Sequence, residues 1–188
     1  YTLTISGTHY GETVSITREV AITVTEHVTL TFNYPDGTKQ QIPVVKGQPV
    51  TGISVPVPVR TGFDFVEWQT ADGKPLDNYV PTGDTEFDPV WNLSAPTVDV
   101  TVSGDLYEDG VVVVTVTATH PLDGQGLTYT YLMADHSAQE ETKQEGNVFY
   151  IHSEGRYSFG VHAVFGDYER FGNYSGYVEV ELIVPVTP

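Results

Sequence analysis

The chain lacks cysteine altogether, contains a single methionine, and has only 8 Lys and Arg residues beside 25 Asp and Glu residues among 188. Without cysteine there is no disulfide, no thiolate zinc site and no cysteine nucleophile. The formal net charge of −17 repels the phosphate backbone of nucleic acids. We therefore expect no nucleic-acid partner.

Long apolar runs are also missing. No stretch approaches the roughly 20 apolar residues of a membrane span, and the N-terminus lacks a charged-then-apolar signal segment. We expect no membrane span in this fragment, so that a signal or anchor would lie outside it. Hydrophobic residues still make up 39% of the chain, enough for a core, and no segment has clear helical periodicity. An all-β fold is indicated.

Residues 1–26 contain two alternating runs, at 1–5 and 20–24, which predict a β-hairpin. Both patterns recur near the C-terminus, at 157–161 and 178–182. We interpret residues 1–26 as the last two strands of an incomplete immunoglobulin (Ig)-like domain. Because a lone hairpin is marginal in water, we expect these strands to dock on the module that follows, residues 27–94, or to pair with a second copy of the chain.

Residues 27–94 form a separate predicted module, rich in strands and aromatic side chains. An alternating strand begins at His27, a Pro-Asp-Gly turn follows at 35–37, and the run Pro58-Val-Arg-Thr-Gly-Phe-Asp-Phe-Val-Glu-Trp68 leads to a closing strand through Trp91. We expect Phe63, Phe65, Trp68, Phe87 and Trp91 to form its core.

This order of motifs resembles the Listeria–Bacteroides repeat, the B-repeat of internalin-type bacterial surface proteins. Val45-Lys-Gly47, the run from Pro58 to Trp68, and Thr85 to Trp91 carry the resemblance. Glu67 stands where the family usually has a second glycine, and Pro89-Val90 where it has Tyr-Ala. The resemblance covers about a third of the chain and implies a β-grasp-like module in secreted or wall-attached proteins, without catalytic residues.

Residues 95–188 show the pattern of an antiparallel β-sandwich, after a proline-bearing boundary at 92–97. Predicted strands lie at 98–102, 111–119, 127–133, 148–152, 157–165 and 177–184. The segment Ser153-Glu-Gly-Arg-Tyr-Ser-Phe159 resembles the entry to strand F of Ig domains, with Tyr157 as the corner tyrosine and Phe159 at the usual cysteine position. We expect a divergent bacterial Ig-like domain.

Two candidate sites emerge in this last domain. The aromatic segment 165–177 has the Tyr, Gly, Asn and Ser composition of a binding loop, and its candidate ligand-binding residues are Tyr168, Arg170, Phe171, Asn173 and Tyr174. The alternative is that its aromatics only fix the loop to the sandwich.

Calcium is the cofactor that the acidic clusters suggest. Asp105, Glu108 and Asp109 form one cluster, and Asp84, Glu86 and Asp88 another, but neither has the spacing of an EF-hand. The alternative is that the acidity serves solubility alone. The six histidines show no pair at metal-ligand spacing, and we expect them at ordinary surface or strand positions.

Taken together, these features predict a non-catalytic, modular fragment of a bacterial cell-surface or secreted protein. It would act as a spacer, an adhesive unit or a self-assembling array, and its partner would be a protein or glycan ligand or copies of itself. The alternative is a carbohydrate-binding or accessory region of a secreted glycoside-active enzyme. Exposed coplanar aromatics would favour that alternative, and buried aromatics would favour the spacer.

Overall fold

The computed structural model describes residues 2–135 and 142–182, which are built from strands and contain no helix, hence none able to cross a membrane. The prediction of an all-β fold is confirmed. The strands are β1 (Thr2–His9), β2 (Glu12–Glu19), β3 (His27–Asn33), β4 (Lys39–Val45), β5 (Phe63–Gln69), β6 (Thr85–Leu93), β7 (Thr97–Asp105), β8 (Val111–Thr119), β9 (Thr128–Asp135), β10 (Lys143–Glu145), β11 (Val148–Ile151), β12 (Gly155–Phe165), β13 (Tyr168–Asn173) and β14 (Val178–Val180).

Contacts between Cα atoms divide the chain into two compact units. The first consists of residues 1–33, 38–54 and 69–88, and the second of 34–37, 55–68 and 89–188. Strands β4, β3, β6 and β5 form one sheet in this order, in which β3 pairs with β4 antiparallel and with β6 parallel.

In the first unit, the core lies around the pairing of β3 with β6. Leu30, Phe32 and Phe87 have no solvent exposure, and the rings of Phe32 and Phe87 stack at 5.4 Å between centroids. Tyr79 meets Phe87 edge to face at 5.2 Å. Consecutive buried residues in β3 show that both faces of this strand are covered.

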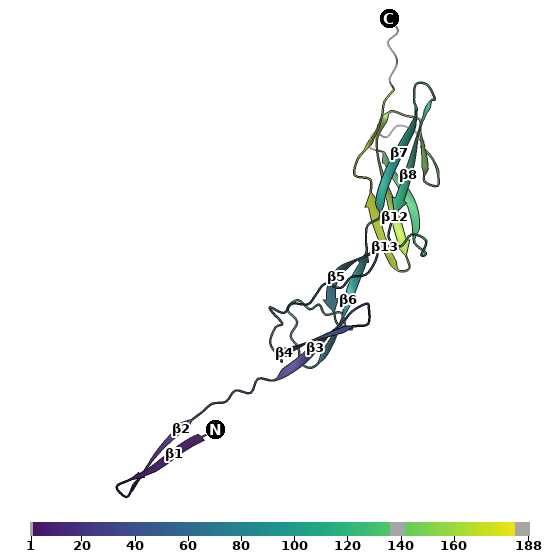
Figure 1. Ribbon diagram of the computed structural model, residues 1–188. Coiled ribbons are helices and arrows are strands. Elements are labelled where there is room, and N and C mark those ends of the chain that lie inside the picture. Colours follow the sequence, from purple (N-terminus) through teal and green to yellow (C-terminus); the bar gives the residue numbers. More distant parts are fainter. Residues whose placement is uncertain (1, 136–141, 183–188) are drawn as a thin grey trace. The chain divides into compact units, whose positions relative to one another are not determined.

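The N-terminal hairpin differs from its prediction. Its second strand is β2, at Glu12–Glu19, whereas the expected strand at 20–24 is not formed (Figure 1). Tyr10 and Gly11 have φ values of 49° and 81°, which is the positive-φ pair of a two-residue hairpin turn. That turn places His9 opposite Glu12. Strand β2 therefore begins directly after the turn.

In the second unit, a set of aromatic side chains packs along β5. The centroid of the Trp68 ring lies 5.2 Å from that of Tyr34 and 5.6 Å from that of Phe65. The centroids of the Phe65 and Trp91 rings are 5.9 Å apart. Trp68 is buried, in line with the predicted core. Phe63 is the exception, because it packs with residues beyond position 120 instead.

The rest of the second unit is a β-sandwich of two antiparallel sheets. One sheet has the order β10-β11-β8-β7, and in the other β12 pairs with β9 on one edge and with β13 and β14 on the opposite edge. These are the orders of strands DEBA and GFC in Ig constant-type domains. Phe149 of one sheet meets Phe159 of the other at 5.3 Å between the sheets.

Tyr157 makes the predicted corner. Its ring is fully buried, and its hydroxyl donates a hydrogen bond to the Ser153 carbonyl oxygen at 3.0 Å. The Ser153 hydroxyl lies 2.9 Å from the same phenol oxygen. Phe159, two residues on, is 2% exposed and occupies the inter-sheet space where Ig domains place a cysteine.

Two strands of the sandwich, the short β10 and the longer β13, were not predicted as such. The segment expected to be a binding loop contains β13, which pairs with β12 from Phe165 opposite Tyr168 to Gly160 opposite Asn173. The Gly166-Asp167 step is a two-residue turn, so the chain folds back at once and the next six residues complete the edge.

We expect Tyr157→Phe to lower the free energy of unfolding by about 1 kcal/mol, because the substitution removes a buried hydroxyl and its hydrogen bond to Ser153. Urea unfolding followed by tryptophan and tyrosine fluorescence measures the change. Tyr107→Phe, at a half-exposed tyrosine, is the matched control and should be neutral. Equal loss in both variants would contradict the corner's role.

Candidate functional site

The five predicted ligand-binding residues lie along β13 and directly after it. Tyr168 is half-buried and packs edge to face on Phe63 at 4.9 Å, so its ring serves internal packing. Tyr174 is also half-buried, and its backbone amide donates to the Phe159 carbonyl at 2.9 Å. Arg170, Phe171 and Asn173 are exposed. The structure therefore brings only part of the set to the surface.

Phe171 is the most prominent of these side chains, with 58% of its surface exposed. Its ring stacks on the imidazole of His162, with 4.4 Å between the ring centroids and an angle of 17° between the ring planes. His162 Nε2 lies 3.1 Å from Glu169 Oε2. All three face outward, because the alternate residues of β12 fill the core. The result is an aromatic platform with a carboxylate beside it.

A hollow of about 300 Å³ lies on the same sheet, where β9, β12 and the end of β13 meet. Gly160 contributes no side chain to its floor, and Leu132, Asn173 and Tyr174 line it. A Cβ at Gly160 would lie 2.8 Å from Asn173 Oδ1, so the glycine leaves room for that amide. The hollow and the platform form one surface, which we call the β12 outer face.

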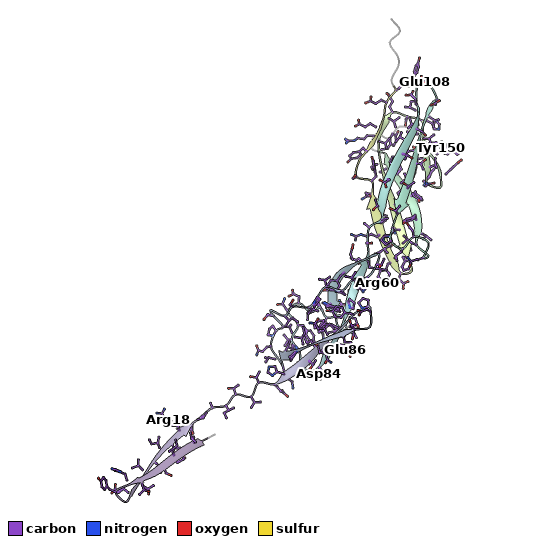
Figure 2. The ribbon with its side chains drawn as sticks, in the orientation of Figure 1. Arg18, Arg60, Asp84, Glu86, Glu108 and Tyr150 are labelled. Carbon is purple, nitrogen blue, oxygen red and sulfur yellow. The ribbon has the colours of Figure 1, made fainter. Side chains whose placement is uncertain are left out.

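The predicted calcium loop is a turn closed by its own acidic side chains. Asp105 Oδ1 accepts hydrogen bonds from the backbone amides of Tyr107 at 2.7 Å and Glu108 at 3.1 Å, and Asp109 Oδ2 accepts one from the amide of Asp105 at 3.0 Å. Glu108 lies in the turn joining β7 and β8 (Figure 2). Among the described residues, no group of three or more acidic or histidine side chains is placed to hold a metal ion. Calcium binding by this loop stays a prediction.

The second acidic cluster ties β6 to β3 instead of gathering around one point. Asp84 Oδ1 accepts from the Thr29 amide at 2.7 Å, and Asp88 Oδ1 accepts from Asn33 Nδ2 at 2.9 Å. Glu86 also accepts a hydrogen bond from Asn33, and this bond, followed by the nearby Lys39 ammonium, lowers the pKa of Glu86. These carboxylates therefore have structural partners.

A third group of residues surrounds the short connection from β6 to β7, and we call it the junction. Leu93, the last residue of β6, is 1% exposed and packs with Leu122 and Ala163 in one cluster. Ser94 follows it, and its amide donates to the Gly62 carbonyl at 3.0 Å. The connection is thus held from both sides.

His120 is the polar centre of the junction. Its Nε2 lies 2.8 Å from Ser94 Oγ and 3.2 Å from the Ser94 carbonyl, and its Nδ1 is 3.2 Å from the Leu122 amide. An amide can only donate, so Nδ1 accepts and the proton of the neutral ring sits on Nε2. The imidazole is 6% exposed and joins the connection to the β8–β9 loop.

Gly62 is required at the junction for two reasons. Its φ of +75° is in the left-handed region, and a Cβ added to it would lie 2.6 Å from Leu122 Cγ and 3.0 Å from His120 Cε1. Beside it, the Arg60 guanidinium lies 3.7 Å above the ring of Phe63, which in turn contacts Tyr168. Such cation–π contacts contribute about 0.5–2 kcal/mol, more where water is excluded.

The junction was missed by sequence reasoning, which placed Phe63 in a module core and treated the histidines as ordinary. The signal for Gly62 and Phe63 was present in the Arg-x-Gly-Phe motif, whose purpose only the structure reveals. For His120 the sequence held no signal, since a lone histidine after a strand is as often exposed as buried.

No protein-family model, curated protein or solved structure matches the chain. The resemblance to the B-repeat accordingly stays a prediction.

A carboxylate at the edge of the junction should make stability depend on pH. Asp123 accepts from the Tyr129 hydroxyl at 2.6 Å and from the His120 amide at 2.8 Å, and these bonds hold the pKa of Asp123 below its ordinary value. Burial, with the nearby Asp123 carboxylate, raises the pKa of Tyr129 above its usual range. The ionised Asp123 therefore favours the folded state.

We expect Asp123→Asn to lower the free energy of unfolding at pH 7. Since the folded-state pKa is depressed, this contribution is complete above the ordinary Asp value of about 4 and is lost as the pH falls through the lower folded-state value. The difference between wild type and variant should therefore shrink below pH ~4, measured by urea unfolding at pH 7 and pH 3. Asp99→Asn, on the exposed side of β7, is the control. A difference independent of pH would contradict the assignment.

Proposed function

We propose that this chain is a non-catalytic part of a bacterial cell-surface or secreted protein, and that it acts there as a spacer between binding or assembling parts. The observation that carries the proposal is the junction. A connection of three residues, 94–96, is fixed by the Ser94–His120 hydrogen bonds and by the packing of Leu93 on Leu122. A flexible linker would instead be solvated and rich in Gly or Ser.

Four further features support this function. Most large aromatic side chains of the described residues are buried or half-buried, as expected of a spacer. The net charge of −17 favours solubility outside the cell, and the absence of cysteine removes dependence on the redox state. The resemblance to the B-repeat implies secreted or wall-attached proteins in which such modules occur in tandem.

The spacer function requires that β5 and β12 move as one body through the junction. In the wild type, ¹⁵N relaxation of their backbone amides should give a common rotational correlation time. Phe63→Ala removes the ring that contacts Tyr168 and Arg60, at a cost of roughly 2 kcal/mol, and the two correlation times should diverge.

Gly62→Ala is a second variant with the same expected outcome, because its Cβ would collide with Leu122. Phe171→Ala removes a phenylalanine that is exposed on β13 and should leave the common correlation time unchanged. Unaltered relaxation in both junction variants would rule out a rigid spacer.

A second candidate function is the binding of a glycan at the β12 outer face. The stack of Phe171 on His162 offers a flat ring to a sugar face, and Glu169 and Asn173 supply polar groups beside it. Concave or flat sites with few polar groups and an exposed aromatic ring suit such ligands.

If this surface binds glycans, Phe171→Ala should weaken binding about tenfold, equivalent to 1.4 kcal/mol. Retention of the protein on immobilised cell-wall and plant polysaccharides measures the effect. Tyr107→Ala, at another half-exposed aromatic, is the control. Equal retention of the wild type and Phe171→Ala would exclude the face as a glycan site.

A further inference from the structure

The N-terminal hairpin has one apolar and one polar face, and neither is covered. Leu3, Ile5, Val14 and Ile16 share one face through the register Ile5 opposite Ile16, and each is 55–66% exposed. The opposite face consists of Thr, Ser and Glu side chains, among which Thr4 and Thr17 lie 3.3 Å apart. In proteins, a sheet with one apolar face is stable when another layer covers that face.

The C-terminal sandwich contains the same unit 156 residues later. The Tyr10-Gly11 turn corresponds to Gly166-Asp167, and the pair His9–Glu12 corresponds to Phe165–Tyr168. In the sequence, Tyr1 corresponds to the corner residue Tyr157 without any gap. The two-residue length of the turn and the register beside it are therefore shared. The hairpins differ in that β1 and β2 form eight residue pairs where β12 and β13 form six, and in that both turn residues have positive φ in the first hairpin but only Gly166 in the second.

The correspondence extends past β2. At the same spacing of 156 residues, Ile22 and Val24 stand where the sandwich has Val178 and Val180, the ends of β14. This alignment lies two residues away from the match of 20–24 with 178–182 that the alternation alone indicated. Val178 and Val180 are 7% and 4% exposed and pair with the start of β12, whereas Ile22 and Val24 are 61% and 86% exposed. Residues equivalent to the start of β12 would precede Leu3, which accounts for the missing strand at 20–24.

The sandwich also shows what covers such a hairpin. Leu3 and Ile5 correspond to Phe159 and Val161, which are 2% and 0% exposed. There, β9 pairs with the edge of β12 that lies opposite β13, and the sheet of β7, β8 and β11 packs on the apolar face of β12. All of these strands come before β12 in the chain, and β11 ends only four residues ahead of it.

We infer that residues 1–24 are the closing strands of a second sandwich, and that the cover of their apolar face is a segment of the same polypeptide, equivalent to residues 97–156, that precedes Tyr1. This inference is based on the register and spacing that the N-terminal hairpin shares with β12 and β13, and it does not depend on the spacer function. The surface accepts an antiparallel strand along the free edge of β1 and an apolar sheet over Leu3 and Ile5.

One difference between the two hairpins has a local cause. Ile16 corresponds to Gly172, where a Cβ would lie 2.5 Å from the Pro96 carbonyl oxygen. That glycine accommodates the junction connection of the C-terminal sandwich. The N-terminal hairpin carries a full side chain at the same position, so a neighbour equivalent to Pro96 would have to lie farther from it.

The test is the full chain extended by a copy of its own residues 97–156, joined directly to Tyr1 so that the register of β12 is reproduced. Hydrogen exchange of the β1 amides and of Ile22 and Val24 is compared with that of the unextended chain. We expect exchange to slow by about 100-fold or more in the extended chain. The double substitution Leu3→Thr and Ile5→Thr should abolish this protection while leaving exchange in the C-terminal sandwich unchanged.

A third variant replaces three β1 residues by their β12 counterparts, Leu3→Phe, Ile5→Val and Gly7→Ala. Protection in this variant but not in the unaltered extended chain would overturn the inference. The added segment would then be able to cover a β12-like hairpin, but the natural hairpin of residues 1–24 would not fit under it. Absence of protection in both would overturn the shared register. A concentration-dependent dimer of the unextended chain that the double substitution abolishes would also overturn it, since the cover would then be a second copy.

Discussion

The close approach of Gly62 to Leu122 and His120 is the constraint on which the junction depends. At 2.6 Å from an added Cβ to Leu122 Cγ, the contact tolerates glycine alone, and the positive φ makes the same demand. With the Gly62 backbone against the side chains of Leu122 and His120, Ser94 lies within hydrogen-bond distance of the imidazole and Phe63 contacts Tyr168. One steric requirement thus accompanies both a hydrogen-bonded group and an aromatic group at the junction.

Much of the fold was predictable because burial on one face leaves a period of two in the sequence. The run at 111–119 alternates in this way, and it is β8 within the same bounds. Tyr157 was identifiable since its corner depends on a local hydrogen bond to Ser153, only four residues away. Structure that depends on neighbouring residues, or on the burial of one face of a strand, can therefore be predicted from the sequence.

The failures share a different cause. Strand β13 carries Arg170 and Gly172 on the side where apolar residues are expected, because Gly172 yields space to Pro96 and not to a core side chain. At the N-terminus, the alternation at 20–24 is genuine, but a strand also needs a partner. Its counterpart β14 pairs with Gly155, Arg156 and Tyr157 at the start of β12, whereas residues 2–9 of β1 all pair with β2. The same cause applies to the candidate site. Tyr168 and His120 contact residues that are distant in the sequence, and no local sequence pattern predicts such contacts.

The parallel pairing of β3 with β6 has a mechanical consequence. Because these two strands run in the same direction, a pull on the chain before His27 and after Leu93 acts at opposite ends of the pair and slides one strand along the other. The hydrogen bonds around Leu30–Thr85 and Phe32–Phe87 then bear the load together instead of opening one after another. In a protein stretched by flow, this geometry resists extension without any covalent cross-link.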